Sequence, residues 1–198
     1  LLQSYAVLIV LALYVGFFVV RYVMPMFFKY MPHDRGREFT VSAEAAKGKP
    51  TGAGVFFITV FVLISLVFVP LTWIQVAMLA LTWIMMLTGY LDDRSVASWG
   101  EYRKALLDLA VCVAASVLLS VYLRQSADGT IRFWFPLFAN SVAVAPWLFV
   151  IISTVLLWAS INTTNCTDGV DGLSSTLVLV ALLTLGVIFY FILGHVDI

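Results

Sequence analysis

Four polar side chains recur at every third position of the stretch NTTNCTDGVDG, which spans residues 162–172. They are Asn162, Asn165, Asp168 and Asp171. On an α-helix each step of three residues turns the side chain by about 60°, whereas on a 3₁₀ turn the side chains line up. Gly169 and Gly172 disfavour a regular helix and let the backbone approach a bound group. The spacing predicts that the four side chains converge on one ligand; the alternative is a polar loop in which Asp171 caps the next helix.

Two adjacent carboxylates, Asp92 and Asp93, stand in the stretch GYLDDRS directly after an apolar segment. Neighbouring carboxylates repel each other unless a cation or a hydrogen-bond donor lies between them. No His or Cys stands beside them, so the oxygen ligands favour a hard ion such as Mg²⁺ over zinc. The pair therefore indicates a site for a divalent metal or for a substrate proton. The alternative is a solvated loop whose charge Arg94 balances.

A third polar segment, KGKPTGAG, supplies Lys47, Lys49 and Thr51 directly before another apolar run. Lysine ammoniums and exposed backbone N–H groups at a helix start form a plausible phosphate site. The alternative is that both lysines only snorkel to the membrane surface and fix the topology. Further along the chain, Lys104 precedes Asp108 by one helical turn, which predicts an ion pair within a single helix.

The composition decides the class of protein in which these residues work. The chain is 63% hydrophobic and 11% charged, and its mean hydropathy is +1.05, far from the averages of soluble domains. The formal net charge is zero, and no basic tract or aromatic-and-basic stripe is present, so we expect no nucleic-acid partner. Cys112 and Cys166 cannot form a disulfide framework and are expected to be small packing residues. The composition therefore predicts that the chain is embedded in a lipid bilayer.

Apolar stretches near the roughly 20 residues that cross a bilayer recur along the chain. They span about residues 1–20, 53–70, 71–91, 105–123, 142–161 and 173–194. Pro70 separates the second stretch from the third, because a continuous apolar run of that length must turn back once. The first stretch lacks a basic leader and a cleavage site, so we expect a helix and not a signal peptide. The sequence predicts an all-α polytopic membrane protein with six transmembrane helices in a single domain, residues 1–198.

The positions of Lys and Arg predict how these helices are oriented. Nine of the eleven basic residues fall in or beside the first and third connections, and only Arg124 and Arg132 belong to the fourth. The positive-inside rule then places the first, third and fifth connections in the cytoplasm, so the three polar segments share one membrane face. The fourth connection combines Asp128-Gly129 with a short aromatic run, which suggests a hairpin at the outer interface.

One membrane face thus carries acidic oxygens, carboxamides, lysines and glycine turns. Phosphoryl transfer from a soluble nucleotide to a membrane-resident acceptor needs this set, because metal and lysine neutralise a pyrophosphate while a carboxylate deprotonates or positions the acceptor. An ion-coupled transporter is an alternative, but it predicts acidic groups near mid-membrane and broken helices. A structural scaffold is a further alternative, which leaves the every-third-residue series unexplained.

The three motifs resemble those of the polyprenyl-phosphate N-acetylhexosamine-1-phosphate transferases. The family pattern N-x-x-N-x-T-D-G-x-D-G-L is matched at every fixed position from Asn162 to Leu173, and LDD and KGKPTGAG stand in the corresponding places. Thr167 before Asp168 favours the branch that transfers phospho-N-acetylmuramoyl-pentapeptide (phospho-MurNAc-pentapeptide). The branch that transfers N-acetylglucosamine-1-phosphate from UDP-N-acetylglucosamine stays open as an alternative. The resemblance covers the whole chain but only the first part of the family fold.

The resemblance implies that phospho-MurNAc-pentapeptide passes from its UDP carrier to undecaprenyl phosphate with Mg²⁺, giving lipid I and UMP in peptidoglycan synthesis. It implies catalytic roles for Asp92, Asp93 and Lys104, in which the two carboxylates handle the lipid phosphate, its proton or the metal. The implied substrate-binding residues are Lys47, Lys49, Thr51, Asn162, Asn165, Asp168, Gly169, Val170 and Asp171. The implied location is the bacterial cytoplasmic membrane, with the active site on the cytoplasmic face and a homodimer as the assembly.

The chain also departs from the family pattern. The segment from Lys49 to Gly54 reads KPTGAG where the family has Thr-Pro-Thr-Met-Gly-Gly, so it stays open which of Lys47 and Lys49 takes the role of the family lysine. Asp108 stands where the family has a glutamine. The family fold has ten helices, with a metal-binding aspartate and a histidine-rich loop in its later part. We therefore expect these residues to be the first part of a ten-helix fold, without the main metal ligand and inactive alone.

Overall fold

The computed structural model describes residues 5–33, 48, 51–95, 99–126, 129–133, 141–167 and 173–188, and these residues are mostly helical. The helices are α1 (Tyr5–Phe27), continued by the 3₁₀ turn η1 (Phe28–Tyr30), then α3 (Gly54–Phe68), α4 (Trp73–Arg94), α5 (Glu101–Ser126), α6 (Pro146–Thr167) and α7 (Leu173–Val187). The strands are β1 (Ile131–Phe133) and β2 (Val142–Val144). One α-helix falls on each predicted apolar stretch, so the expectation of a chain built from apolar helices is confirmed.

Four of the helices in the described ranges are long and apolar enough to cross a membrane. Their spans are Val7–Tyr30, Trp73–Arg94, Tyr102–Gln125 and Pro146–Thr164. Two further apolar helices, Gly54–Phe68 and Ser175–Val187, are shorter. Helix α3 has 15 residues, which is about 22 Å of helix against a hydrocarbon core of about 30 Å. The structure therefore describes a multi-pass membrane protein with four candidate spans. The number of six transmembrane helices remains a prediction.

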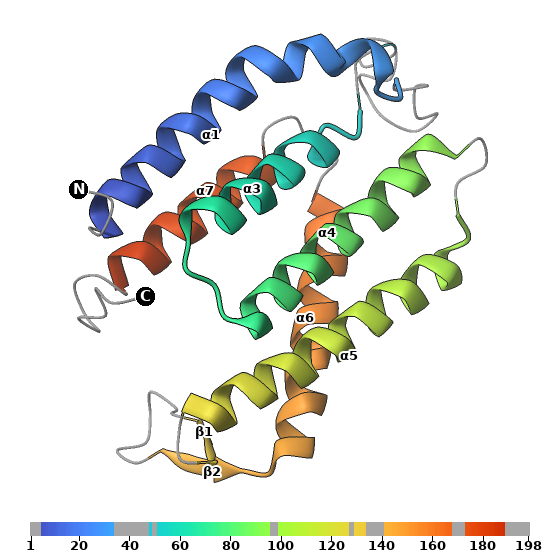
Figure 1. The fold of residues 1–198 in the computed structure, drawn as a ribbon. Coiled ribbons are helices and arrows are strands. Elements are labelled where there is room, and N and C mark those ends of the chain that lie inside the picture. The colour runs from blue at the N-terminus through green and yellow to red at the C-terminus, as the bar shows by residue number, and fades with distance from the viewer. Residues whose placement is uncertain are drawn as a thin grey trace. The chain divides into compact units, whose positions relative to one another are not determined.

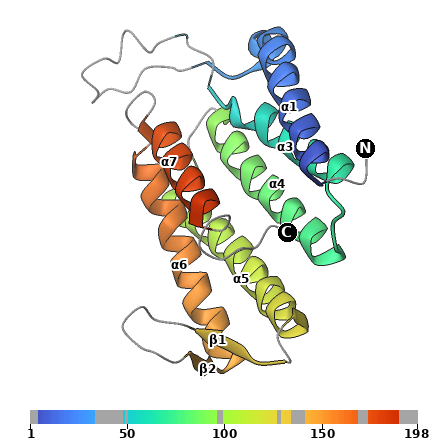
Figure 2. The ribbon, with the colours of Figure 1, turned by 90° about the vertical axis from the view of Figure 1, so that its left-hand side faces the viewer.

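The chain divides into two compact units, Leu1–Thr154 and Val155–Ile198. In the first unit α1 packs on α3, α3 on α4 and α4 on α5, so helices that follow one another in sequence are neighbours in space (Figure 1). The hairpin lies at the end of α5 that points away from the connection to α4 (Figure 2). The second unit contains the C-terminal part of α6 and helix α7.

The buried face of α5 is made of small and polar side chains. Along α5, every fourth residue from Asp108 is buried, which gives one continuous face. These residues are Asp108, Cys112, Ser116 and Ser120, at 3%, 2%, 0% and 6% exposure. Large apolar side chains, by contrast, are exposed on every helix of the described chain. Small residues between helices and apolar residues outside are the arrangement expected of a bundle in lipid.

Helix α1 extends further than the predicted stretch of residues 1–20. It includes Arg21 and Pro25 and ends at Phe27, so the prediction that Arg21 lies in the first connection is wrong. The residues from Tyr22 to Met24 are apolar or aromatic, and the exposed Arg21 guanidinium lies 5.9 Å from the centre of the Tyr22 ring, close enough for a cation–π interaction. A single cation of this kind does not end an apolar helix.

The predicted hairpin exists, but Asp128-Gly129 precedes its first strand and does not connect its two strands. Strands β1 and β2 are antiparallel, with Ile131 opposite Val144 and Phe133 opposite Val142, so residues 134–141 connect them. Gly129 instead closes α5: its φ is +78°, and its N–H donates to the Arg124 carbonyl at 3.1 Å. A left-handed glycine after the last turn satisfies free helix carbonyls. The Asp-Gly signal therefore marked a helix end.

Two further boundaries differ from the predicted stretches. Helix α6 begins at Pro146 and not near residue 142, because Val142 pairs in the hairpin and proline suits the first position of a helix. It continues to Thr167, beyond the predicted end of the stretch near residue 161, so Asn162 and Asn165 lie on regular helix. The two glycines that disfavour a helix come later, and residues 168–172 lie outside the described ranges.

Candidate functional site

The last turn of α4 carries both adjacent carboxylates. Ser95 ends the helix: its N–H and its Oγ donate to the Asp92 carbonyl at 3.1 and 2.7 Å. Asp92 is half-buried, whereas Asp93 is exposed on the same turn. Consecutive helical residues point about 100° apart. The two carboxylates therefore face different surroundings, one toward the packed helices and one toward the outside.

The Asp92 carboxylate is held by one donor from the connection that follows α4 and one from α5 itself. Its Oδ1 accepts a hydrogen bond from the Trp99 N–H at 2.8 Å, and its Oδ2 lies 3.4 Å from the Lys104 ammonium. The side chains of Lys104 and Asp92 are 31% and 17% exposed. Gly100 starts α5, since its carbonyl accepts from the N–H groups of Arg103 and Lys104. The short connection thus returns the chain so that Lys104 reaches back to α4.

The ion pair of Lys104 differs from the predicted one. We expected Asp108 as the partner, one turn along α5, but the ion pair that the described residues form is with Asp92. Asp108 is buried at 3% exposure and still interacts electrostatically with both Lys104 and Asp92. Lysine preceding aspartate by four residues is the less favourable order on a helix, whereas Asp92 approaches from a neighbouring helix. The Lys104 ammonium therefore pairs with the carboxylate of the neighbouring helix, Asp92, and only interacts at longer range with the one on its own helix.

The start of α3 comes to the same end of α4. Gly52 has φ of +70°, and a Cβ built on it would lie 3.0 Å from Cδ2 of Tyr90, two residues before Asp92. Thr51 is fixed by two hydrogen bonds to the Pro32 carbonyl, 2.7 Å from its N–H and 3.1 Å from its Oγ1. The first unit therefore brings the Thr51 segment and the LDD segment together.

The remaining predicted site residues are only partly described. Lys47, Lys49, Asp168, Gly169, Val170 and Asp171 lie outside the described residues, as does the side chain of Asn165. Asn162 belongs to the second unit, where its Nδ2 donates to the Trp158 carbonyl at 2.8 Å and the side chain is half-buried. In this arrangement its amide oxygen stays available as an acceptor. The structure brings Thr51, Asp92, Asp93 and Lys104 into one region of the first unit. Asn162 belongs to the second unit and is described by itself.

The side chains at the end of α4 offer oxygen ligands to a metal ion. Within the described ranges, no group of three or more His, Cys, Asp or Glu side chains is arranged to hold one. Mg²⁺ does not need such a cage, because it is commonly bound by one or two carboxylates together with substrate phosphates and water. Asp93 and Asp92 supply carboxylate oxygens only. This oxygen set fits Mg²⁺ bound in company with a phosphate ligand.

Two groups that support the site were not found from the sequence. The Trp99 N–H holds Asp92 in place, but a backbone donor has no signature in the sequence because every residue except proline has one. Tyr90 contacts the start of α3 and reads in the sequence as one more apolar helix residue. The glycine at position 52 was the available signal, since a glycine directly before a helix often permits close approach.

Comparison with known proteins decides the family. Residues 75–198, more than half of the chain, match the model of glycosyl transferase family 4. The chain belongs to this family. The matched region includes Asp92, Asp93 and Lys104 as well as the polar stretch from Asn162. No solved structure matches the chain significantly.

Similar curated proteins are named phospho-N-acetylmuramoyl-pentapeptide-transferase. One from Treponema pallidum (strain Nichols) is 52% identical over 99% of this chain and 53% of its own length. A relative from Gemmatimonas aurantiaca is 34% identical over 83% of the chain and 47% of its length, and one from Campylobacter hominis is 27% identical over 93% and 54%. The resemblance drawn from the motifs is confirmed. The chain spans about half the length of these relatives.

Proposed function

We propose that this chain is part of an enzyme that transfers phospho-MurNAc-pentapeptide from its UDP carrier to undecaprenyl phosphate, giving lipid I and UMP in peptidoglycan synthesis. The observation that carries the proposal is the Asp92–Lys104 pair, 3.4 Å apart at the end of two apolar helices, in a chain that is 52% identical to a transferase of that name. A membrane-boundary carboxylate and lysine are suited to a reaction between a lipid phosphate and a water-soluble pyrophosphate.

The reaction exchanges one phosphoanhydride bond for another. A phosphate oxygen of the lipid attacks the phosphorus next to the sugar, the bond from that phosphorus to the bridging oxygen breaks, and UMP leaves with that oxygen. Lys104 stabilises the negative charge that develops on the phosphates. Asp92, held by the Trp99 N–H, keeps the ammonium at the membrane boundary. The exposed Asp93 accepts the proton of the lipid phosphate.

Mg²⁺ is proposed as the cofactor. Asp93 and Asp92 would hold it together with phosphate oxygens of the substrate, and the ion supplies positive charge that neutralises the pyrophosphate. Chelation with EDTA is expected to abolish transfer, and excess Mg²⁺ is expected to restore it. Activity that persists in EDTA would contradict the proposed Mg²⁺ and would leave the proposed roles of the side chains unchanged.

The proposed setting is the bacterial cytoplasmic membrane, with the site on the cytoplasmic face. Six spans within these residues, as part of a ten-helix fold, complete the proposed architecture, and a homodimer is the proposed assembly. UDP-MurNAc-pentapeptide enters from the cytoplasm, whereas undecaprenyl phosphate stays in the bilayer. Thr51, Lys47 and Lys49 are proposed to contact phosphate, and the residues from Asn162 to Asp171 the nucleotide.

Donor competition tests this proposal. The full-length protein in detergent with Mg²⁺ and undecaprenyl phosphate would be given radiolabelled UDP-MurNAc-pentapeptide or radiolabelled UDP-N-acetylglucosamine. We expect labelled lipid from the first donor only. Labelled lipid from the second donor alone would keep the site and change the sugar, and no labelled lipid from either would reject the proposed reaction.

A further inference from the structure

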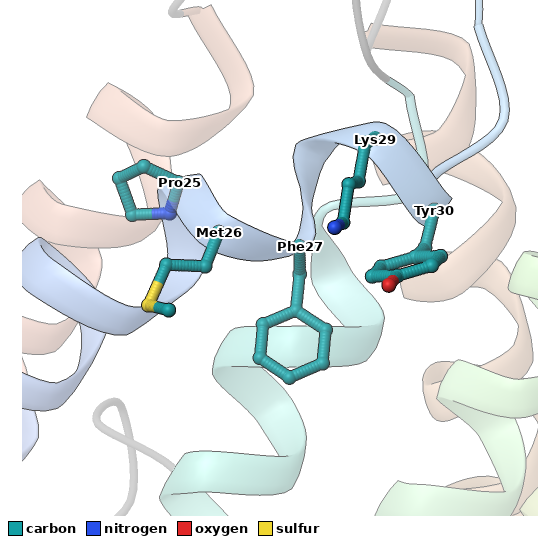
Figure 3. A pocket seen from close by; sticks show the side chains of 5 residues that line it. All are labelled: Pro25, Met26, Phe27, Lys29 and Tyr30. Carbon is teal, nitrogen blue, oxygen red and sulfur yellow. The ribbon is translucent and has the colours of Figure 1, made fainter.

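An open groove of about 480 Å³ lies at the end of α1. Its lining is Pro25, Met26, Phe27, Lys29 and Tyr30 (Figure 3). Four of these side chains are apolar or aromatic, and the fifth is a cation. The groove therefore has one charged end and one apolar end.

The charged end is formed by Lys29 and Tyr30. The Lys29 ammonium lies 4.8 Å from the centre of the Tyr30 ring (Figure 3), which holds the flexible lysine in one place. Among the residues that the structure describes, Lys29 has no carboxylate within ion-pair distance, and none of the lining residues is acidic. Both side chains are exposed, Tyr30 at 69%. The positive charge is thus available to an anion from outside.

The apolar end continues into the membrane-facing surface of α1. Phe27 packs on Phe56 of α3 with ring centres 5.3 Å apart, which fixes the floor of the groove. Pro25 has no N–H to donate within the helix, and Met26 is 67% exposed beside it. The candidate span Val7–Tyr30 ends here, so the groove lies where hydrocarbon gives way to lipid head groups.

We propose that this groove binds one anionic phospholipid of the bilayer. Its phosphate lies on Lys29 and the Tyr30 hydroxyl, and the upper part of an acyl chain lies along Pro25, Met26 and Phe27. Charge complementarity selects the occupant: the one charge among the described lining residues is positive, so it attracts a net anionic head group and gains little from a zwitterionic one, whose own cation it repels. None of these lining residues is a candidate site residue, so the proposal does not depend on the proposed transfer reaction.

Native mass spectrometry of the full-length protein tests this site. The purified protein would be titrated with phosphatidylglycerol or phosphatidylcholine of identical acyl chains. We expect one phosphatidylglycerol to bind more tightly than phosphatidylcholine, and Lys29→Gln to weaken it about fivefold, the effect of one basic residue near an anionic surface. Lys29→Arg should retain binding. Arg132→Gln, the same loss of charge on strand β1, is the matched control and should bind as the wild type does.

Three results would overturn the site. They are equal affinity of the wild type for the two lipids, unchanged phosphatidylglycerol binding by Lys29→Gln, and an equal loss in Arg132→Gln, which would indicate bulk charge instead of a site. Tyr30→Phe provides a second variant, expected to weaken phosphatidylglycerol binding by removing the hydroxyl while keeping the ring. The measured quantity is the amount of phospholipid bound to the protein. Loss of this proposal would therefore not contradict the proposed transfer reaction, and loss of the transfer proposal would not contradict the lipid site.

Discussion

At the scale of single residues, Lys104 connects two helices and two carboxylates. Its ammonium lies 3.4 Å from Asp92 and within electrostatic reach of the buried Asp108. The ammonium is held at the end of the two helices by the ion pair with Asp92. It therefore meets an incoming phosphate without further rearrangement, which is the condition under which a fixed charge is most effective in catalysis.

Replacing Lys104 by glutamine is expected to lower the transfer rate by about 10²- to 10³-fold, as removal of one charge-stabilising donor does elsewhere. Lys104→Arg should recover part of that rate because it keeps the charge. Arg103→Gln is the matched control, since Arg103 is exposed on the adjacent position of α5. The measurement is the initial rate of labelled-lipid formation at saturating donor. Equal rates in Lys104→Gln and the wild type would exclude the lysine from the site.

At the scale of the elements, a side-chain hydrogen bond joins α3 to α4. The Trp83 Nε1–H donates to the Thr59 Oγ1 at 3.1 Å, and the same hydroxyl donates to the Val55 carbonyl at 2.6 Å. A double-mutant cycle of Thr59→Val and Trp83→Phe is expected to give a coupling free energy of about 0.6 kcal/mol, at most ~1.7. Unfolding in detergent followed by far-ultraviolet circular dichroism would measure it.

The control for that cycle is Thr82→Val combined with Trp83→Phe. The Thr82 hydroxyl donates to the Met78 carbonyl of its own helix at 3.0 Å. These two substitutions should therefore be additive. A coupling as large as that between Thr59 and Trp83 would show that the interhelical bond does not contribute.

The close approach of α3 to α4 depends on a glycine. Gly52 and Gly129 both have a positive φ, but only at Gly52 would a Cβ meet neighbouring atoms, Cδ2 of Tyr90 at 3.0 Å and Cγ of Pro32 at 3.4 Å. Gly129→Ala is expected to lower the free energy of unfolding by about 1–2 kcal/mol, the cost of a left-handed alanine. Gly52→Ala should cost more, and it alone should also slow transfer. Equal losses of stability would argue against tight packing at Gly52.

Which elements the sequence reveals depends on whether the deciding contact is local. The turn at Pro70 between two apolar runs is readable because proline cannot continue a helix. The continuation of α1 past Arg21 is not, because a single exposed arginine beside an aromatic ring does not end the helix although a basic residue is typical of a connection. The pairing of Lys104 with Asp92 is hidden for another reason: it depends on how α4 and α5 pack, whereas the spacing to Asp108 is visible in one helix.

At the scale of the whole molecule, the orientation of α5 determines which face carries the site. The helix has 26 residues, about 39 Å, which exceeds the roughly 30 Å hydrocarbon core. As a candidate span, it is expected to place its two ends on opposite sides of the membrane. The proposed topology places the end near Tyr102 in the cytoplasm and the end near Thr130 outside.

Sided labelling tests this orientation. Tyr102, 92% exposed, and Thr130, also exposed, would be replaced singly by cysteine in a background in which Cys112 and Cys166 are serine. In inverted membrane vesicles, a thiol reagent that cannot cross the bilayer should label the cysteine at position 102 and not the one at position 130. The opposite pattern would reverse the topology and remove the site from the cytoplasm.

The central claim is that the carboxylate at the end of α4 takes part in transfer to a membrane lipid. The direct measurement is radiolabel transfer from UDP-MurNAc-pentapeptide to undecaprenyl phosphate by the full-length protein with Mg²⁺, comparing wild type with Asp92→Asn. Asparagine keeps an oxygen for the Trp99 N–H and loses the charge, so we expect a rate about 10²- to 10⁴-fold lower in a folded protein. Asp128→Asn, the same change in another connection, should be as active as the wild type. Asp92→Asn turning over at the wild-type rate would contradict the claim.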